Sequence, residues 1–202
     1  MFTGLIREIA EARSFNNGRL ELLARYRPQV GDSIAVNGAC LTVTALSNKG
    51  FTADVSHETA AAIALENLRG KVHVEPALQF NGRIEGHFVQ GHIDYVGKVS
   101  NIIKREKSID LFIAVRKEAL TLIAPKGSIA IDGVSLTVSE TFADRFRLTI
   151  VPHTLTNTLI AGYAAGRSVN IETDLFARYT ARILRRHDSI NWEDVERIGA
   201  IF

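Results

Sequence analysis

The stretch SIAVNGACLTV, residues 33–43, returns later in the chain as SIAIDGVSLTV, residues 128–138. Each residue of the first copy matches the residue 95 positions further on, as residue 33 matches residue 128, and seven of the eleven positions are identical. The other four change conservatively. Convergent strand composition explains such agreement poorly, so the sequence indicates an internal duplication.

The duplication extends over most of the chain. The same spacing continues without a gap as far as Thr59 and Thr154, and a spacing of 87 aligns the segment that begins at Gly4 with the segment that begins at Gly91. This period is too long for a solenoid, so we expect each copy to be a small domain with its own pocket. We place the domains at residues 1–86 and 87–173, followed by a helix and tail at 174–202. Two similar pockets predict two similar ligands.

Short alternating or β-branched segments make up most of each repeat. They lie at residues 33–36, 41–44, 51–55 and 71–75, and again at 128–131, 136–139, 145–151 and 168–172. Many short strands separated by turns indicate an all-β barrel or sandwich. Asn37-Gly38 and Asp132-Gly133 are hairpin signals, because both residue types tolerate the positive φ of a tight turn. Short helices are expected at 58–67 and 155–165.

After residue 172 the pattern changes to helical spacing. The apolar residues are Leu175, Phe176, Tyr179, Ile183 and Leu184, with Arg178, Arg182, Arg185 and Arg186 between them. Such an amphipathic helix either folds back on its own barrel or associates with another copy. We favour self-association, because the helix has no counterpart in the first repeat. The tail over 187–202 contains the one tryptophan, Trp192, and a second candidate helix at 191–198.

Composition narrows the class of ligand. The 24 basic and 22 acidic residues nearly balance and are scattered, which predicts no nucleic-acid or membrane partner. One cysteine rules out an intramolecular disulfide. The sequence has no signal-like start and no apolar run long enough to span a bilayer, so we expect a cytoplasmic protein with small-molecule ligands.

Two histidines, His87 and His92, stand where the second repeat begins. On a regular strand their separation would point the rings to opposite faces, and no third ligand stands at a recognisable spacing, so no metal site is expected. Two hydrogen-bonded histidines at a domain junction are the simpler alternative. However, neither imidazole has a counterpart in the first repeat, where the residue matching His92 is Leu5.

Other aligned pairs also differ between the repeats. Cys40 pairs with Ser135, Asn37 with Asp132, Glu58 with His153, and His57 with Pro152. Each residue taken alone is more often structural. Together they indicate one scaffold that holds two differently equipped sites, which suits a reaction in which two similar molecules play unlike parts. Thr42 and Thr137 are identical and offer either a shared ligand contact or simple β-propensity.

Five motifs carry a resemblance to a known family. They are MFTGLI at the start, VNGACLTV, GHFVQGHID, IDGVSLTV and VPHTL, in that order. Over residues 1 to about 186 the chain closely resembles the riboflavin synthase (alpha chain) family, whose members contain lumazine-binding repeats. The resemblance implies two tandem six-stranded Greek-key barrels and a C-terminal helix that holds a homotrimer. It also implies association with lumazine synthase.

The activity implied by the resemblance needs no cofactor and no metal. Two molecules of 6,7-dimethyl-8-ribityllumazine exchange a four-carbon unit and give riboflavin and 5-amino-6-ribitylaminouracil. In this family the reacting site forms between the N-terminal barrel of one subunit and the C-terminal barrel of a neighbour. The resemblance implies a catalytic set of His87, His92, Cys40, Ser135, Asp132 and Ser33, with His87 transferring protons and Ser135 and Cys40 at the two reaction centres.

The resemblance also assigns substrate contacts. The first lumazine is expected to touch Gly4, Leu5, Ile6, Cys40, Leu41, Thr42, Asp54, Val55, Ser56, His57, Glu58 and Thr59. The second is expected to touch Gly91, His92, Ile93, Lys126, Ser135, Leu136, Thr137, Thr149, Ile150, Val151, Pro152, His153 and Thr154.

Two departures and two alternatives accompany the resemblance. Glu85 replaces a glycine that the family usually has before Gly-His, and the tail after residue 186 is an extension. A non-catalytic lumazine or flavin carrier of the antenna type could use the same repeats, but it would not need His87, His92 or Ser135. A flavin-dependent oxidoreductase is disfavoured, because no G-x-G-x-x-G motif follows a strand.

Overall fold

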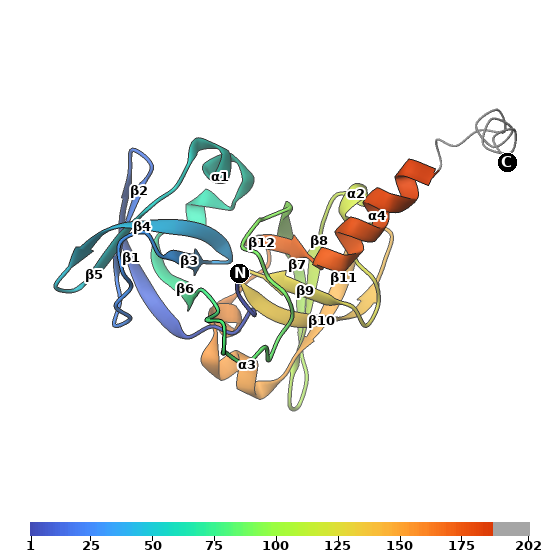
Figure 1. The fold of residues 1–202 in the computed structure, drawn as a ribbon. Coiled ribbons are helices and arrows are strands. Elements are labelled where there is room, and N and C mark those ends of the chain that lie inside the picture. The colour runs from blue at the N-terminus through green and yellow to red at the C-terminus, as the bar shows by residue number, and fades with distance from the viewer. Residues whose placement is uncertain (188–202) are drawn as a thin grey trace, which may run out of the picture.

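The structure, a computed structural model, describes residues 1–187, so the candidate helix at 191–198 and Trp192 lie outside the described residues. The described chain forms two closed six-stranded barrels followed by a C-terminal helix (Figure 1). The expected all-β chain with two tandem barrels is therefore confirmed.

The two barrels have the same strand order. The first contains β1 (Glu8–Asn16), β2 (Arg19–Leu23), β3 (Ser33–Val36), β4 (Ala39–Ser47), β5 (Gly50–Asp54) and β6 (Gly70–Pro76). The second contains β7 (Tyr95–Lys104), β8 (Ile109–Ala114), β9 (Ser128–Ile131), β10 (Val134–Thr141), β11 (Arg145–Ile150) and β12 (Ser168–Thr173). Antiparallel pairing runs β1-β2-β5-β4-β3-β6 in the first barrel and follows the equivalent order in the second. The placement of β6 beside β3 makes β3 to β6 a Greek key.

Four of these strands, β1, β2, β7 and β8, are absent from the strands expected from the sequence. In β1 the inward-facing residues include Ala10 and Ala12, and charged Glu11 and Arg13 alternate with them. Alanine is a weak β former with little apolar contrast, so the period-2 pattern is faint. The strand forms because β2 and β6 pair with it on both sides.

Each barrel encloses its own core, and the two cores correspond residue by residue. Phe51 of the first barrel and Phe146 of the second are equivalent by the repeat spacing and are 1% and 0% exposed. Leu20, Leu22 and Ile34 surround the first ring inside its barrel. Burial of a side chain of this size stabilises the folded state by about 1.5–3 kcal/mol.

The two predicted hairpin turns are confirmed and meet at the junction between the barrels. Asn37 and Gly38 have φ of 44° and 81°, and Asp132 and Gly133 have φ of 44° and 82°, as a type I′ turn requires. A Cβ on Gly38 would lie 2.6 Å from the Gly133 nitrogen. The close approach of two backbones therefore requires glycine in both turns.

The short helices follow β5 and β11. The segment expected at 58–67 is α1 (His57–Ala62) with the 3-10 helix η1 (Leu65–Asn67), and the segment expected at 155–165 is α3 (Pro152–Asn157) with η2 (Leu159–Gly162). One further helix, α2 (Lys117–Leu120), was not expected. Helix α1 begins at the N-cap Ser56, whose hydroxyl accepts a bond from the Thr59 N–H at 3.0 Å.

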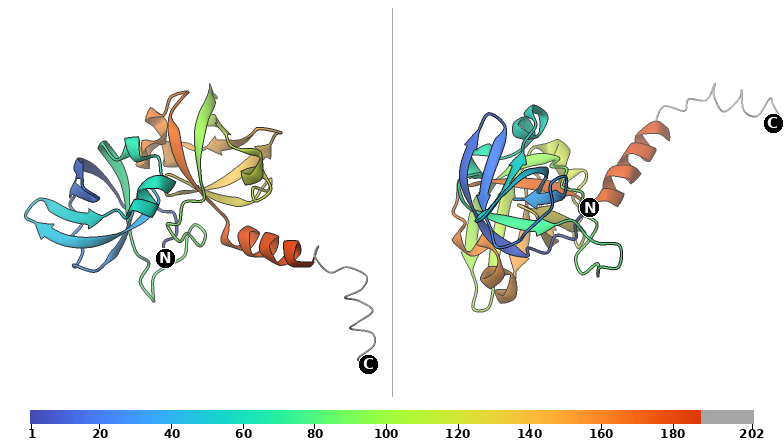
Figure 2. Two further views of the ribbon diagram at one scale, coloured as in Figure 1. Left: turned by 90° about the horizontal axis from the view of Figure 1, so that it is seen from above. Right: turned by 60° about the vertical axis from the view of Figure 1, so that its left-hand side comes forward.

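The C-terminal helix α4 (Leu175–His187) is confirmed and projects away from the second barrel, as Figures 1 and 2 show. Its large apolar side chains are between 57% and 65% exposed, namely Phe176, Tyr179, Ile183 and Leu184. The helix is thus not folded back over its own barrel. No helix of residues 1–187 is long and apolar enough to cross a membrane.

The N-terminal segment runs between the two barrels (Figure 1). Phe2 and Val89, which are equivalent by the 87-residue spacing, exchange two backbone hydrogen bonds of 2.7 and 3.1 Å. Both side chains are buried in a small core with Ala35 and Ala130. The junction is therefore approximately two-fold symmetric, and residues from the start of each repeat lie at its centre.

Candidate functional site

A cavity of about 500 Å³ lies beside Cys40 at the junction of the barrels. Strand β4 places Cys40 at its start, and the capped first turn of α1 places Glu58 and Thr59 on the facing wall. The cavity is lined by Ala39, Cys40, Glu58, Thr59, Ala62, Ile63, Gly91, His92 and Ile93. Three predicted contacts of the first ligand, Cys40, Glu58 and Thr59, are thus brought together.

One wall of this cavity comes from the second repeat. The Cys40 N–H donates to the Gly91 carbonyl at 2.8 Å, and Ile93 packs against the core of the first barrel. A Cβ on Gly91 would lie 2.6 Å from the Cys40 Cβ. The segment around Gly91 therefore lies directly against Cys40, and only glycine at position 91 allows this contact.

The N-terminal segment makes the equivalent contact with the second barrel. The Ser135 N–H donates to the Gly4 carbonyl at 2.7 Å, and Ile6 packs against the core of the second barrel. A Cβ on Gly4 would lie 2.6 Å from the Ser135 Cβ. Each repeat thus contributes its leading segment to the other repeat's site.

This exchange corrects the expected grouping of the site residues. The sequence grouped Gly4, Leu5 and Ile6 with the first barrel's site and Gly91, His92 and Ile93 with the second. The structure places Gly91, His92 and Ile93 beside Cys40, and Gly4 beside Ser135. The repeat alignment shows which residues are equivalent, but it does not show which barrel a connecting segment covers.

His87 and Ser135, two predicted catalytic residues, contact each other. The His87 Nδ1 lies 2.8 Å from the Ser135 Oγ, and the His87 N–H donates to the Thr3 carbonyl at 3.2 Å. Burial lowers the pKa of His87, and the charge of Asp174 opposes part of that shift. The lowered pKa favours the neutral ring, the form in which an imidazole can accept a proton.

The other ring nitrogen of His87 is also informative. Its Nε2 is buried and has no hydrogen-bond partner among residues 1–187. Buried polar atoms are nearly always paired, so an atom of this kind at a site points to a ligand or a transferred proton.

The backbone beside His87 depends on Gly86 rather than on the unusual Glu85. A Cβ on Gly86 would lie 2.0 Å from the Thr3 carbonyl oxygen and 3.0 Å from the Ser135 Oγ. Glu85 is exposed, and its carboxylate lies 3.2 Å from Arg83 and 3.9 Å from Arg7. The substitution at Glu85 thus adds surface ion pairs, while the close contact is made by the next residue.

The structure does not bring Asp132 to the Cys40 cavity. Its side chain is 0% exposed, and its oxygens accept bonds from the Asn170 N–H at 2.8 Å and the Tyr163 hydroxyl at 2.5 Å, with Arg167 at 3.6 Å. Burial raises the pKa of Asp132. These contacts indicate that Asp132 holds the barrel junction. The resemblance had implied direct catalysis by this residue.

Ser33 is also outside the cavity. It begins β3, where it pairs in register with Thr42, and its side chain is exposed. Thr42 and Thr137 are both exposed at equivalent strand positions. The structure thus places Thr42 and Thr137 alike, and the side chain of Ser33 forms no hydrogen bond with Cys40 or His92.

The remaining predicted contacts are divided between core and surface. Leu41, Val55 and Ile150 are buried in the barrel cores, and Leu136 packs partly against one of them. The others lie at strand ends or helix starts on the surface, namely Asp54, Ser56, His57, Lys126, Thr149, Val151, Pro152, His153 and, partly buried, Thr154. The Thr149 hydroxyl donates to Asp110 at 3.0 Å, a contact that the sequence did not suggest.

Sequence reasoning also missed two buried glutamates that hold the exchanged segments. Glu75 accepts bonds from the Thr3 and Gly4 N–H groups at 2.8 and 3.1 Å, and Glu172 accepts from those of Gln90 and Gly91 at 2.7 and 2.8 Å. The two residues occupy equivalent places in β6 and β12, both of which pair with the barrel's first and third strands. A glutamate occurs at the equivalent place in both repeats, and this repetition could have identified Glu75 and Glu172 from the sequence.

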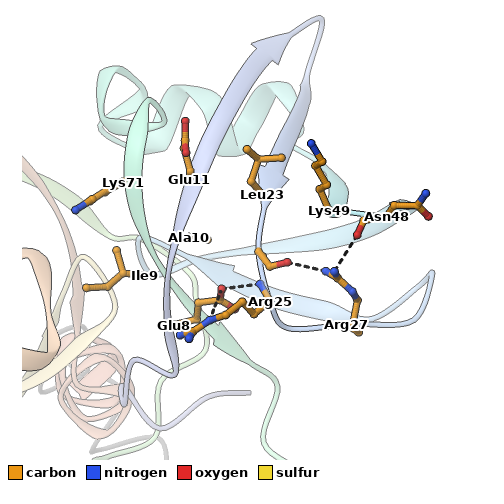
Figure 3. A pocket seen from close by; sticks show the side chains of 11 residues that line it. Glu8, Ile9, Ala10, Glu11, Leu23, Arg25, Arg27, Asn48, Lys49 and Lys71 are labelled. Carbon is orange, nitrogen blue, oxygen red and sulfur yellow. Dashed lines mark hydrogen bonds and ion pairs between the residues drawn. The ribbon is translucent and has the colours of Figure 1, made fainter.

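A second cavity, of about 550 Å³, lies on the outside of the first barrel (Figure 3). Its Glu8 accepts bonds from the Arg25 and Tyr26 N–H groups, and its Arg27 donates to the carbonyls of Ala24 and Asn48. These contacts fix the backbone of the loop after β2, so the polar side chains of this cavity are already used to stabilise that loop. Within residues 1–187 no group of three or more His, Cys, Asp or Glu side chains could hold a metal ion.

Comparison with known proteins agrees with this geometry. The family model for the lumazine binding domain matches the chain twice, over residues 3–77 and 90–174. The chain belongs to the lumazine-binding domain family. Each match spans one barrel, so both barrels are lumazine-binding domains by sequence.

The chain matches relatives over most or all of its length. The riboflavin synthase of Photobacterium leiognathi is 36% identical over 217 residues and covers 100% of both chains. That of Actinobacillus pleuropneumoniae is 39% identical and covers 91% of this chain and 90% of the relative. Among solved structures, LumP complexed with riboflavin has a TM-score of 0.77 at 23% identity, covering 86% of this chain and 99% of that one. LumP in complex with 6,7-dimethyl-8-(1'-D-ribityl) lumazine has a TM-score of 0.74. The likeness to LumP supports the fold.

Proposed function

We propose that this chain is a riboflavin synthase, a transferase that converts two molecules of 6,7-dimethyl-8-ribityllumazine into riboflavin and 5-amino-6-ribitylaminouracil. The observation that carries the proposal is the hydrogen bond between His87 and Ser135 in a chain whose full length matches enzymes named riboflavin synthase. The two substrate molecules contain all the atoms of both products. The exchange therefore needs no oxidant, reductant or cofactor.

Two unlike sites on one scaffold fit this reaction. The proposed first site contains Cys40, Glu58 and Thr59 with Gly91 and His92. The proposed second site is built around Ser135, with Gly4 and His87 against it. One lumazine donates the four-carbon unit and the other accepts it, so the difference between Cys40 and Ser135 matches a difference in role.

The chemistry assigns a task to each polar group. The C7 methyl of the lumazine is acidic because its anion is delocalised into the ring, so a modest base such as neutral His87 can remove the proton. A nucleophile then adds to C7 of the partner, and hydrogen-bond donors stabilise the charge that develops on the ring. We assign the hydroxyl of Ser135 and the thiol of Cys40 to the two centres, with water as the other candidate nucleophile. Two ligands held face to face also react with far less loss of entropy.

Assembly is part of the proposal. We infer a homotrimer formed through α4, in which the first barrel of one subunit faces the second barrel of its neighbour. The exposed apolar side chains Phe176, Tyr179, Ile183 and Leu184 support association through this helix. Association with lumazine synthase and a cytoplasmic location complete the proposal and rest on the sequence. Sedimentation of a mixture with lumazine synthase would test the association.

The function is tested by mixing the purified protein with the lumazine alone. Formation of riboflavin, followed by its absorbance and by chromatography, is the expected result. The Ser135→Ala variant serves as the control, since it removes a hydroxyl at one centre, and a melting curve checks that it is folded. Tight binding of the lumazine without any riboflavin formed would instead identify a carrier of the antenna type.

A further inference from the structure

One side chain of helix α4 contacts the loop 90–94 beside the Cys40 cavity. Arg178, at the end of the first turn of the helix, donates to the Gln90 Oε1 at 2.9 Å. The same guanidinium lies 3.2 Å from the Asp94 carboxylate and 3.4 Å from the Glu172 carboxylate. The Arg178 side chain is only 21% exposed, so the contacts are shielded from solvent.

The two carboxylates that Arg178 contacts hold opposite ends of the loop 90–94. Glu172 is 1% exposed and accepts the N–H groups of Gln90 and Gly91. Asp94 accepts the N–H and hydroxyl of Thr173 at 2.8 and 2.7 Å. Without a cation the negative charges of these two carboxylates would repel each other. The Arg178 guanidinium offsets that repulsion, because it hydrogen-bonds to both carboxylates at once.

The loop that is held in this way forms a wall of the first site. Gly91 seats on Cys40, and His92 and Ile93 line the cavity beside it. A shift of this loop would therefore change both the shape of the cavity and the covering of the Cys40 thiol.

The first repeat provides a natural comparison. Glu75 holds Thr3 and Gly4 against Ser135 as Glu172 holds Gln90 and Gly91 against Cys40. Its carboxylate accepts from the Thr3 hydroxyl at 3.0 Å, and within residues 1–187 it forms no ion pair. The segment at Ser135 is thus held without an arginine, and the loop at Cys40 is held with one.

We propose that Arg178 is a positioning residue that ties the loop 90–94, and with it the Cys40 cavity, to helix α4. Its catalytic consequence rests on the proposed function, since it supposes that a lumazine binds at Cys40. The positioning itself can be measured without any ligand.

Cys40 is the one cysteine of the chain, so its alkylation by iodoacetamide reports on this loop directly. In Arg178→Gln we expect the alkylation rate of the unliganded full-length protein to rise roughly tenfold, which corresponds to about 1.4 kcal/mol less protection. Arg182→Gln is the matched control, because this exposed arginine lies one turn further along α4 and contacts neither carboxylate. Equal rates in the two variants would overturn the proposal.

A second pair of variants separates the loop from a general loss of stability. Each carboxylate oxygen of Glu172 accepts one backbone N–H, whereas glutamine has one carbonyl oxygen and one NH₂ group, so Glu172→Gln cannot keep both bonds on separate oxygens. We expect Glu172→Gln to accelerate Cys40 alkylation and Glu75→Gln, its equivalent at the other site, to leave the rate unchanged. If both variants alkylate faster, and the increase follows the fall in their melting temperatures, general loss of stability explains the result and the assignment is contradicted.

Turnover distinguishes the positioning role from the proposed function. If the protein makes riboflavin, Arg178→Gln should raise KM more than it lowers kcat, and Arg178→Lys should restore part of the loss. If the protein makes no riboflavin while the alkylation pattern is as expected, the proposed function fails and the positioning of the loop stands.

Discussion

At the residue scale, His87 combines three properties of an acid–base group. It contacts Ser135, its pKa is lowered by burial, and its Nε2 is buried without a partner in the described chain. A structural histidine at a junction normally has both nitrogens bonded, as His73 has with the Asp132 carbonyl and the Leu159 N–H. The contrast between the two histidines favours a chemical role for His87.

We therefore predict that His87→Ala lowers kcat by roughly 10²–10⁴-fold, the usual effect of removing a positioned acid–base group. Ligand binding should change much less. Single-turnover conversion of bound lumazine, with a melting curve for the same sample, measures both. A stable variant that turns over at the wild-type rate would remove His87 from the mechanism.

The pH profile provides a separate check on His87. Because burial lowers the pKa of His87 below its ordinary 6.5, the ring remains the neutral base at and above that pH. The acid limb of kcat/KM should therefore lie below pH 6.5, where protonation removes the base. An acid limb centred above pH 7 would indicate a different group.

A second prediction concerns the glycine that covers Cys40. Gly91→Ala should destabilise the fold by about 2 kcal/mol or more, because φ is +80° and the new Cβ would lie 2.6 Å from the Cys40 Cβ. Gly166→Ala is the control for φ alone, since φ there is +91° and nothing lies within 4 Å. Urea unfolding of both variants separates the steric cost from the backbone cost. Equal losses would show that the close contact is unimportant.

Only part of the site could be predicted from individual residues. The duplication identified Cys40 and Ser135 as equivalent centres, and both are half-buried at the barrel junction. Which barrel Gly4 and Gly91 cover depends on how two domains pack, and one repeat's sequence contains no local signal for that. The prediction for Asp132 was wrong for a similar reason. A turn residue is usually exposed, and Asp132 is buried because the two hairpin turns pack against each other at the junction.

At the element scale, the strands predicted from the sequence have β-branched or apolar patterns, and two of the missed strands, β1 and β7, have weak ones. Strands β2 (RLELL) and β8 (IDLFIA) were missed although their apolar patterns are clear. The expected segments 33–36 and 128–131 coincide with β3 and β9. By contrast β7 contains Gly97 and four exposed polar side chains, and its stability comes from β8 and β12 on either side. Tertiary pairing overrides weak local preference in such strands.

Helix α4 was predicted from the helical spacing of its apolar residues alone. Its exposed apolar face leads to a third prediction. Ile183→Glu should weaken association of the full-length protein, because a charge would enter the apolar face that we propose as the contact between copies. Arg182→Glu changes an exposed residue of the polar face and serves as the control. Sedimentation velocity is expected to show a smaller species for Ile183→Glu alone. A wild-type protein that sediments as a monomer would contradict the proposed assembly.

At the scale of the whole molecule, the junction is held by a buried polar network with two-fold equivalence. His73 donates from Nδ1 to the Asp132 carbonyl and accepts at Nε2 from the Leu159 N–H. Its equivalent Asn170 donates to the Asn37 carbonyl and accepts from the Ala64 N–H. Since one nitrogen of His73 must accept, the imidazole has to be neutral for the junction to form.

A fourth prediction follows for the pH dependence of folding. Burial lowers the pKa of His73 from 6.5 to about 4, so the unfolded chain binds a proton that the folded chain excludes between these values. The stability is present above pH 6.5 and is lost as the pH falls toward 4, by roughly 2 kcal/mol between pH 7 and pH 5. Urea unfolding of wild type and His73→Asn at both pH values should show a smaller fall in the variant. Equal falls would mean that other groups account for the acid sensitivity.

The exchange of leading segments also has a consequence for the order in which the protein can mature on the ribosome. Residues 2–4 are synthesised first, yet their partners Glu75, Val89 and Ser135 follow much later in the chain. The first barrel can close as soon as β6 has emerged, but its cavity stays open on one side until the loop 90–94 arrives. The Ser135 site waits longer still, for β10 to dock onto a segment made at the outset. Nascent chains stalled before β10 should therefore contain a folded first barrel but no Ser135 site, so the pair of sites that the proposed reaction needs is complete only after the second barrel has formed.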